Sequence, residues 1–348
     1  MKHANIPIFI PHLGCPNDCV FCNQRKITGH DEFDASSVIP QIESALSTLN
    51  GRKAQIAFFG GSFTGIDRGL MIKLLEIGYG YIRTGAVDSM RCSTRPDYIN
   101  SEILDILESY GVKTVELGIQ STSDTVLTAS RRGHSAECSL KAMRAVKEHG
   151  FELIGQMMTC LPRSALSDEI KTAQDICDMN ADGARIYPLV VFKETALAKM
   201  TESGEYTPVD ASENIYRAKE VKKVFLKNNV PVIRLGLQAQ DNLSSDGDIA
   251  AGEYQSAIGV MVDGAIYLEL LCEKLDKYTS DELKCAFLNV ECTVGASSAV
   301  AGINKENKRI LLEKYGLYKI KITEKEAMKP FEISIRVVAD ARRGSRCI

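Results

Sequence analysis

Long apolar runs are absent from this sequence of 348 residues. A membrane-spanning helix needs about 20 consecutive, mostly apolar residues, and no segment here approaches that length. The opening segment MKHANIPIFIPHLG lacks the basic, apolar and small-residue regions of a secretory signal. We therefore expect a cytoplasmic protein without a membrane partner.

A strong net charge is also absent, since 42 Lys and Arg against 45 Asp and Glu leave −3. The charge is unevenly distributed: residues 301–348 carry 12 basic and 6 acidic residues, a net of +6, so the preceding 300 residues carry −9. A basic end on an acidic body indicates an anionic partner, although a solvated surface is the simpler explanation of such a segment. Repeats and low-complexity tracts, which would indicate a solenoid or disorder, are missing as well.

Short apolar runs alternate with helical patterns through the first 192 residues. This alternation predicts βαβ units and a parallel sheet, but it does not separate an open doubly wound sheet from a partly closed barrel. The expected strands are 6–12, 54–61, 87–94, 112–121, 151–162 and 183–192, and the expected helices are 38–49, 69–82, 100–111, 135–150 and 167–179.

The pattern changes after this region. A long amphipathic helix is expected over 207–228, followed by a strand in PVIRLGLQ and a second α+β region that ends on the strands LYKIKI and FEISIRVV. We therefore predict a first domain over 1–230 and a small α+β domain over 231–348. A helix in INKENKRILLEKYG starts with Lys305, Lys308 and Arg309, which either face phosphates or are simply solvated.

Three of the eleven cysteines, Cys15, Cys19 and Cys22, fall within eight residues, and the other cysteines show no ligand spacing. A zinc site needs a fourth ligand, and no second CxxC or HxxxH follows, although His12 or His30 would complete such a site. Three thiolates on one loop also suit a [4Fe–4S] cluster in which one iron keeps an open position. Both sites remain open on spacing alone.

The arrangement Cys15-x-x-x-Cys19-x-Phe21-Cys22 after an expected strand resembles the signature of radical S-adenosylmethionine (radical SAM) enzymes. That resemblance implies that the three cysteines hold a [4Fe–4S] cluster and that S-adenosyl-L-methionine (SAM) chelates the open iron. It also implies that Phe21 lies beside these cofactors. Reductive cleavage of SAM would then yield a 5′-deoxyadenosyl radical. FFGGSF is similar to the family's glycine-pair motif, which implies that Gly60, Gly61 and Ser62 receive the methionine end of SAM.

Three further segments, CSTRPDY, VELGIQS and QMMTCLP, resemble a subgroup that holds oxygen-independent coproporphyrinogen oxidase and the catalytic subunit of Elongator. By position, Ser93, Gln120, Arg132 and Gln156 would make the remaining contacts to SAM. Ser93 and Gln156 stand where the porphyrin enzymes have carboxylates, which argues against a porphyrin enzyme. Structural alternatives are a strand cap for Gln120 and a surface charge for Arg132.

The segment ARIYPLVVFKETALAKMTESGEYTP is closer to the Elongator-like proteins, but no glycine-rich acetyl-CoA loop follows Val230. The acetyltransferase half of that reaction is therefore expected to be absent. The resemblance implies a partial (βα)₆ barrel with the cofactors at the carboxyl ends of its strands. Arg185 and Tyr187 alternate on one strand face and either point into the barrel or belong to its core.

The resulting hypothesis is a radical SAM enzyme that acts on tRNA or another RNA base and docks it through the basic C-terminal domain. Its electron donor would be a flavodoxin or a ferredoxin. An alternative substrate is a small organic or porphyrin-like molecule. An alternative of another class is a non-enzymatic metal-binding interaction module, which zinc with four ligands would favour.

Overall fold

The computed structural model describes residues 4–10, 13–15, 19–23, 33–49, 52–237, 247–252 and 254–339. The chain divides into two compact units: residues 1–217 with 224–254, and residues 218–223 with 255–348. The candidate zinc ligands His12 and His30 and the basic segment after Ala339 lie outside the described residues. None of the described helices is long and apolar enough to cross a membrane.

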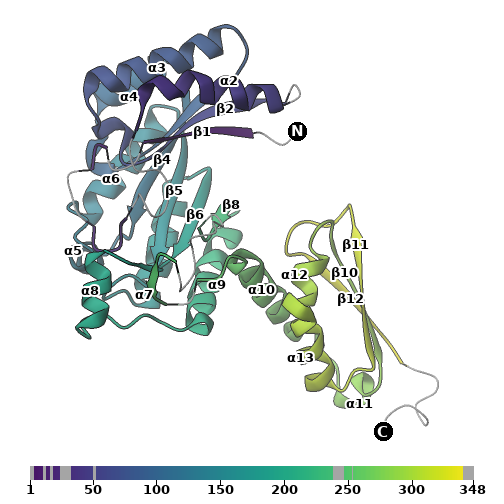
Figure 1. Ribbon diagram of the computed structural model, residues 1–348. Coiled ribbons are helices and arrows are strands. Elements are labelled where there is room, and N and C mark those ends of the chain that lie inside the picture. The colour runs from purple at the N-terminus through teal and green to yellow at the C-terminus, as the bar shows by residue number, and fades with distance from the viewer. Residues whose placement is uncertain are drawn as a thin grey trace. The chain divides into compact units, whose positions relative to one another are not determined.

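Seven parallel strands form the sheet of the first unit, in the order β1-β2-β3-β4-β5-β6-β8. They are β1 (Ala4–Ile10), β2 (Ala54–Gly60), β3 (Ser89–Thr94), β4 (Val112–Gln120), β5 (Glu152–Thr159), β6 (Gly183–Pro188) and β8 (Val232–Leu235). Successive strands are neighbours in space, and the sheet curls into a partial barrel (Figure 1). The expected barrel is therefore confirmed, and it is extended by one strand.

Helices cover the convex face of this sheet (Figure 1). They are α2 (Val38–Thr48), α3 (Arg68–Arg83), α4 (Ser101–Ser109), α6 (Ala136–Glu148) and α7 (Leu166–Asp178), and shorter or later ones are α5 (Asp124–Ala129), α8 (Ala196–Glu202) and α9 (Ala211–Lys227). Alternate strand residues such as Ile6, Ile8 and Ile10 are buried under the helices, as a period of two requires. The other half of each strand faces the concave side.

Polar residues mark the helix starts. Asn100 accepts a hydrogen bond from the Ile103 N–H, and Ser135 accepts one from the Cys138 N–H. These caps satisfy backbone donors that the first helical turn leaves unpaired. The predicted Ser135 start of α6 is thus confirmed. Short 3₁₀ helices lie at Ala35–Ser37, Phe63–Gly65, Pro96–Tyr98 and Ile303–Lys305.

The structure differs from the predicted elements in two places. The last expected strand, 183–192, is split into β6 and a separate β7 (Val191–Phe192), which pairs antiparallel with β9 (Ile249–Ala251). The predicted division at residue 230 would separate β8 from the sheet, whereas β8 pairs with β6. Apolar pattern locates a strand but carries no information about its partner, so neither feature was visible in the sequence.

The second unit is a three-stranded sheet in the order β11-β10-β12 with helices on one face (Figure 1). Its strands are β10 (Phe287–Thr293), β11 (Lys319–Lys325) and β12 (Ile333–Val338), and its helices are α10 (Ile258–Leu275), α11 (Ser280–Leu283), α12 (Ser297–Ala301) and α13 (Glu306–Tyr315). Buried Asn307 donates from Nδ2 to the Gly264 carbonyl over 2.8 Å and so joins α13 to α10.

Candidate active site

The predicted site residues follow the carboxyl ends of neighbouring strands. β2 ends at Gly60, β3 at Thr94, β4 at Gln120 and β5 at Thr159. Because these strands are parallel, their carboxyl ends lie on one rim of the sheet, which is where barrel folds place their chemistry. The topology therefore brings together residues that are up to about a hundred positions apart.

The segment that carries the cysteines is anchored to this rim. The Val20 N–H donates to the Ser130 carbonyl over 3.2 Å, and the Leu197 N–H donates to the Val20 carbonyl over 2.8 Å. Val20 is fully buried, and Phe21 packs against the same apolar cluster. Phe21, which is predicted to lie beside the cofactor, therefore also helps to hold the segment in place.

Glycines let the loops after β1 and β2 touch backbone to backbone. A Cβ on Gly61 would come within 2.0 Å of the Leu13 carbonyl oxygen, and a Cβ on Gly14 would come within 2.3 Å of the Ser62 carbonyl oxygen. Gly60 also has a φ of +113°, which other residues rarely adopt. The glycine pair is thus required by the fold here, and it holds the start of the cysteine segment against β2.

Three hydroxyl groups join the ends of β2 and β3. Ser62 Oγ lies 2.8 Å from Thr94 Oγ1, and Thr64 Oγ1 lies 2.6 Å from the same atom. Ser62 Oγ also accepts from the Arg95 N–H over 3.2 Å. Since the Ser62 side chain is committed to these bonds, any contact of this residue with a ligand would come from its backbone. Thr94 was missed from the sequence, although it directly follows Ser93 at a strand end.

Two buried arginines connect the rim to the cysteine segment. Arg95 is 2% exposed, pairs with Asp97 at 2.8 Å and donates from Nη2 to the Arg132 carbonyl over 2.8 Å. Arg132 donates from Nη1 to Cys19 Sγ over 3.4 Å and from Nη2 to the Gly118 carbonyl. The alternative that Arg132 is a surface charge is therefore wrong, and the exposed arginine is its neighbour Arg131.

The positive charges of Arg132 and Arg95 affect the pKa of the Cys15 thiol. Burial raises the pKa of the Cys15 thiol, and the charges of Arg132 and Arg95 oppose that rise. A nearby cation stabilises a thiolate, which is the form that binds metal. The two arginines are thus placed to favour the ligating form of this cysteine.

Gln120 and Gln156, which are both predicted to contact SAM, lie close to each other. Gln156 Nε2 donates to Gln120 Oε1 over 3.3 Å. A register shift between Gly118 and Gln120 interrupts the β4–β5 pairing, and Gln120 has a φ of 67°. Such an irregularity redirects a side chain at a strand end. Ser93 is half-buried and aligns with Glu116 in the β3–β4 register.

A charged cluster that the sequence reading missed lies deeper along the strands. Glu116 Oε1 lies 2.8 Å from Arg91 Nη1, and Glu116 Oε2 lies 2.8 Å from Arg185 Nε. Arg185 also lies over the Phe59 ring, with 5.5 Å from its guanidinium carbon to the ring centroid. Arg185 thus faces the concave side of the sheet, which is one of the two positions predicted for it. The sequence feature that could have revealed this cluster is a glutamate within an otherwise largely apolar strand.

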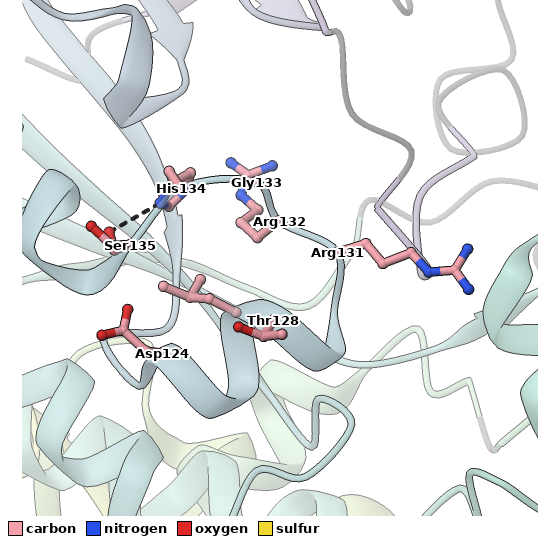
Figure 2. Close-up of a pocket in the computed structure, with 8 residues that line it drawn as sticks. Asp124, Thr128, Arg131, Arg132, Gly133, His134 and Ser135 are labelled. Atoms are coloured by element: carbon pink, nitrogen blue, oxygen red, sulfur yellow. Dashed lines mark hydrogen bonds between the residues drawn. The ribbon is translucent and has the colours of Figure 1, made fainter.

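A pocket of about 610 Å³ adjoins this site at the connection between α5 and α6 (Figure 2). Its lining residues are Asp124, Leu127, Thr128, Arg131, Arg132, Gly133, His134 and Ser135. The side chains of Arg131 and Arg132 point in different directions in Figure 2. Burial, together with the charge of Arg132, lowers the pKa of His134 to about 4, so this ring is neutral near pH 7.

The three cysteines provide the donor atoms that an iron–sulfur cluster needs, in a setting that suits one. Their side chains do not, however, converge on a single point. Within the described part of the chain, no three Cys, His, Asp or Glu side chains are gathered so that they could hold a metal ion. Cys15, Cys19 and Cys22 nevertheless offer three thiols on one segment, and two buried guanidinium groups lie beside them. Soft thiolate donors of this kind select zinc or iron–sulfur clusters.

Comparisons with known proteins agree with this fold. A family model described as the radical SAM superfamily matches residues 9–176, and one described as a radical SAM C-terminal domain matches residues 181–267. The solved structure of Elp3 from the archaeon Methanocaldococcus infernus, with residues 1–46 deleted, has a TM-score of 0.59 at 20% identity. It covers 80% of this chain and 64% of that one.

Two known sequences illustrate the range of relatives. An uncharacterized protein of Methanocaldococcus jannaschii is 25% identical over 274 residues, which are 75% of this chain and 82% of that protein. The tRNA uridine(34) acetyltransferase of Methanocaldococcus infernus is 31% identical over 137 residues, which are 38% of this chain and 26% of that enzyme. The chain therefore spans about a quarter of the acetyltransferase relative.

Proposed function

We propose that this chain, which belongs to the radical SAM superfamily, is an enzyme that modifies tRNA or another RNA base. The superfamily's cofactors are a [4Fe–4S] cluster and SAM. A member of this superfamily is an enzyme, so the alternative of a non-enzymatic metal-binding module is set aside.

Cys15, Cys19 and Cys22 are proposed to hold the cluster. A [4Fe–4S] cluster bound there would supply the electron for reductive cleavage of SAM to methionine and a 5′-deoxyadenosyl radical. Arg132 positions Cys19 through its hydrogen bond to the sulfur and, with Arg95, offsets the negative charge of the thiolates. The buried residues of this rim, which include Ser62, Arg95 and Arg132, limit the access of water to the site.

The SAM-binding residues follow from the same rim. The backbone of Gly60, Gly61 and Ser62 is proposed to accept the methionine ammonium, because the Ser62 hydroxyl is already bonded to Thr94. Gln120 and Gln156 are proposed to bind the ribose hydroxyls, since a pair of amide groups offers both donors and acceptors. Ser93, half-buried on the neighbouring strand, is proposed to complete this contact.

The activity of a relative supports an RNA substrate. The tRNA uridine(34) acetyltransferase resembles this chain over 137 residues at 31% identity, which is the strongest similarity to a protein of stated activity reported above. The net charge of +6 in residues 301–348 agrees with a polyanionic substrate. Together these two observations favour RNA over an uncharged small molecule.

A porphyrin-like or other carboxylate-bearing small substrate is the competing candidate. It would need basic side chains on the concave face that are available to its carboxylates. Arg91 and Arg185 lie on that face, but both pair with Glu116. This pairing disfavours the small-substrate alternative.

The test is anaerobic. The chain is loaded with iron and sulfide, reduced with dithionite and given SAM, and 5′-deoxyadenosine is measured with and without total tRNA. We expect tRNA to stimulate 5′-deoxyadenosine formation and a modified nucleoside to appear in digested tRNA by mass spectrometry. A Cys19→Ala variant is the control and should give neither. Formation of 5′-deoxyadenosine that tRNA leaves unchanged, without a new nucleoside, would contradict the RNA substrate.

A further inference from the structure

The sheet of the second unit has one face covered by helices and one that no described helix of that unit covers (Figure 1). Leu288, Val290 and Cys292 of β10 are buried against the helices. Strand residues alternate between faces, so Phe287, Asn289 and Glu291 lie on the opposite side. The side chains on that uncovered side determine what the surface can bind.

Basic residues dominate this uncovered face. Lys321 aligns with Asn289, which in turn aligns with Arg336 on the other side of β10, and Lys319 aligns with Phe287. All three basic residues are exposed. Among the residues that the structure describes, none of the three forms an ion pair.

Among the described strand residues on this face, the single acidic one is Glu291, which pairs with Lys325 at 3.4 Å. Arg309 and Lys314 of α13, on the helix side of the unit, differ, because Arg309 lies near Glu306 and Glu313, and Lys314 lies near Asp276. An ordinary solvated surface mixes charges of both signs in this way. The uncovered sheet face instead keeps an excess of positive charge.

An aromatic pair lies at one end of this sheet, where Phe287 is on the uncovered face and Tyr318 directly precedes Lys319 of β11. The Phe287 and Tyr318 rings meet edge to face, with 5.1 Å between their centroids and 68° between their planes. Neither ring belongs to the apolar core on the helix side, and Tyr318 is 43% exposed. An exposed ring beside basic side chains on a sheet is a feature that binds single-stranded nucleic acid, since a base stacks on the ring and phosphates contact the cations.

We propose that this face binds a single-stranded segment of RNA, with a base stacked on Tyr318 and phosphates contacted by Lys319, Lys321 and Arg336. The inference rests on the proposed function, because it assigns the docking surface for the RNA substrate. A single strand is favoured over a duplex because its unpaired bases are open to stacking, whereas a duplex buries the faces of its bases.

The test measures RNA binding by the full chain and needs neither cofactor nor turnover. A fluorescein-labelled single-stranded RNA of about 12 nucleotides is titrated by fluorescence anisotropy at several salt concentrations, beside a hairpin duplex and total tRNA as competitors. We expect the single strand to bind more tightly than the duplex and binding to weaken steeply with salt.

Two sets of variants separate phosphate contacts from stacking. Lys321→Gln with Arg336→Gln should weaken binding at least tenfold and lower the slope of log affinity against log salt by about 1.4. Tyr318→Ala should weaken binding roughly tenfold without changing that slope, and Tyr318→Phe should bind as the wild type does. The matched control, Lys314→Gln with Arg309→Gln, removes the same charge from α13 on the helix side and should leave binding unchanged.

Each outcome decides one claim. If the wild type binds neither RNA probe nor tRNA at low salt, the RNA substrate fails and this surface fails with it. If the wild type binds RNA but the sheet variants bind equally well, only the surface assignment is overturned. Equal losses in the sheet and control pairs, or equal affinity for duplex and single strand with no effect of Tyr318→Ala, would mean that net charge alone attracts RNA. Circular dichroism of every variant confirms that the chain is folded.

Discussion

Arg132 donates a hydrogen bond from Nη1 to Cys19 Sγ over 3.4 Å, although 113 positions separate the two residues. Its second amino group donates to the Gly118 carbonyl at the end of β4. One guanidinium therefore connects a proposed ligand cysteine to the rim of the sheet.

Replacing Arg132 by lysine should reduce 5′-deoxyadenosine formation roughly tenfold or more. Lysine keeps the positive charge, but a single ammonium cannot reach both the sulfur and the carbonyl in the geometry of a planar guanidinium. The control is Arg131→Lys, which changes the exposed neighbour and should leave turnover unchanged. Equal activity in the two variants would mean that the charge of Arg132 matters and its geometry does not.

Replacing Gly61 by alanine should disrupt the rim. The new Cβ would approach the Leu13 carbonyl oxygen to 2.0 Å, so the loop that leads to Cys15 would have to shift. We expect a loss of about 1–3 kcal/mol of unfolding free energy and weaker SAM binding by calorimetry of the loaded chain. Gly80→Ala is the matched control: its Cβ meets nothing within 4 Å, and it should be neutral or stabilising. Unaltered SAM binding by Gly61→Ala would contradict the close contact.

Replacing Glu116 by glutamine should destabilise the chain by about 3 kcal/mol or more. The change leaves Arg91 and Arg185 without a carboxylate, and both are largely buried, with 11% and 16% of their side chains exposed. Urea unfolding followed by circular dichroism measures the loss. Glu102→Gln, which breaks the exposed pair with Arg68, should cost less than about 0.5 kcal/mol. A small loss for Glu116→Gln would indicate that water or a ligand replaces the ion pair.

Acid should weaken the fold through His134. The folded state holds the pKa of this ring near 4, whereas the unfolded chain has about 6.5, so only the unfolded state takes up a proton between these values. This contribution to stability is complete above pH 6.5 and is lost as the pH falls toward 4. After allowance for partial exposure, we expect about 1 kcal/mol less loss between pH 7 and pH 5 in His134→Gln than in the wild type. Parallel pH profiles would refute this assignment.

The sequence predicted the fold well where the signal is local. The six expected strands coincide with β1 to β6 to within a few residues at their ends, and the Ser135 cap lies where α6 begins. The register and the partner of β8 were not predictable, because strand pairing joins distant segments. The short helix α5, with six residues, also escaped, since so brief a segment shows little periodicity.

The features of the candidate site also fall into those that are local in the sequence and those that join distant segments. The cysteine triplet and the glycine pair are local motifs, and the sequence located both. The burial of Arg132, the contact between Ser62 and Thr94 and the pairing of Glu116 with two arginines arise only when separate strands align. No spacing rule connects these residues in the sequence. The sequence therefore located the proposed ligands more readily than the groups that surround them.

The cysteine segment lies within the connection from β1 to β2, whereas the groups around it come from β2, β3, β4 and the loop after α5. Three thiols only a few residues apart stay close together even in an unfolded chain, so they can bind iron before the chain folds. Arg95, Arg132 and the Gly60–Ser62 turn arrive only after the slow pairing of parallel strands. Correct cluster assembly should therefore be the last step of maturation, and iron supplied to a chain that has not folded would be held by thiols alone, open to water and oxygen.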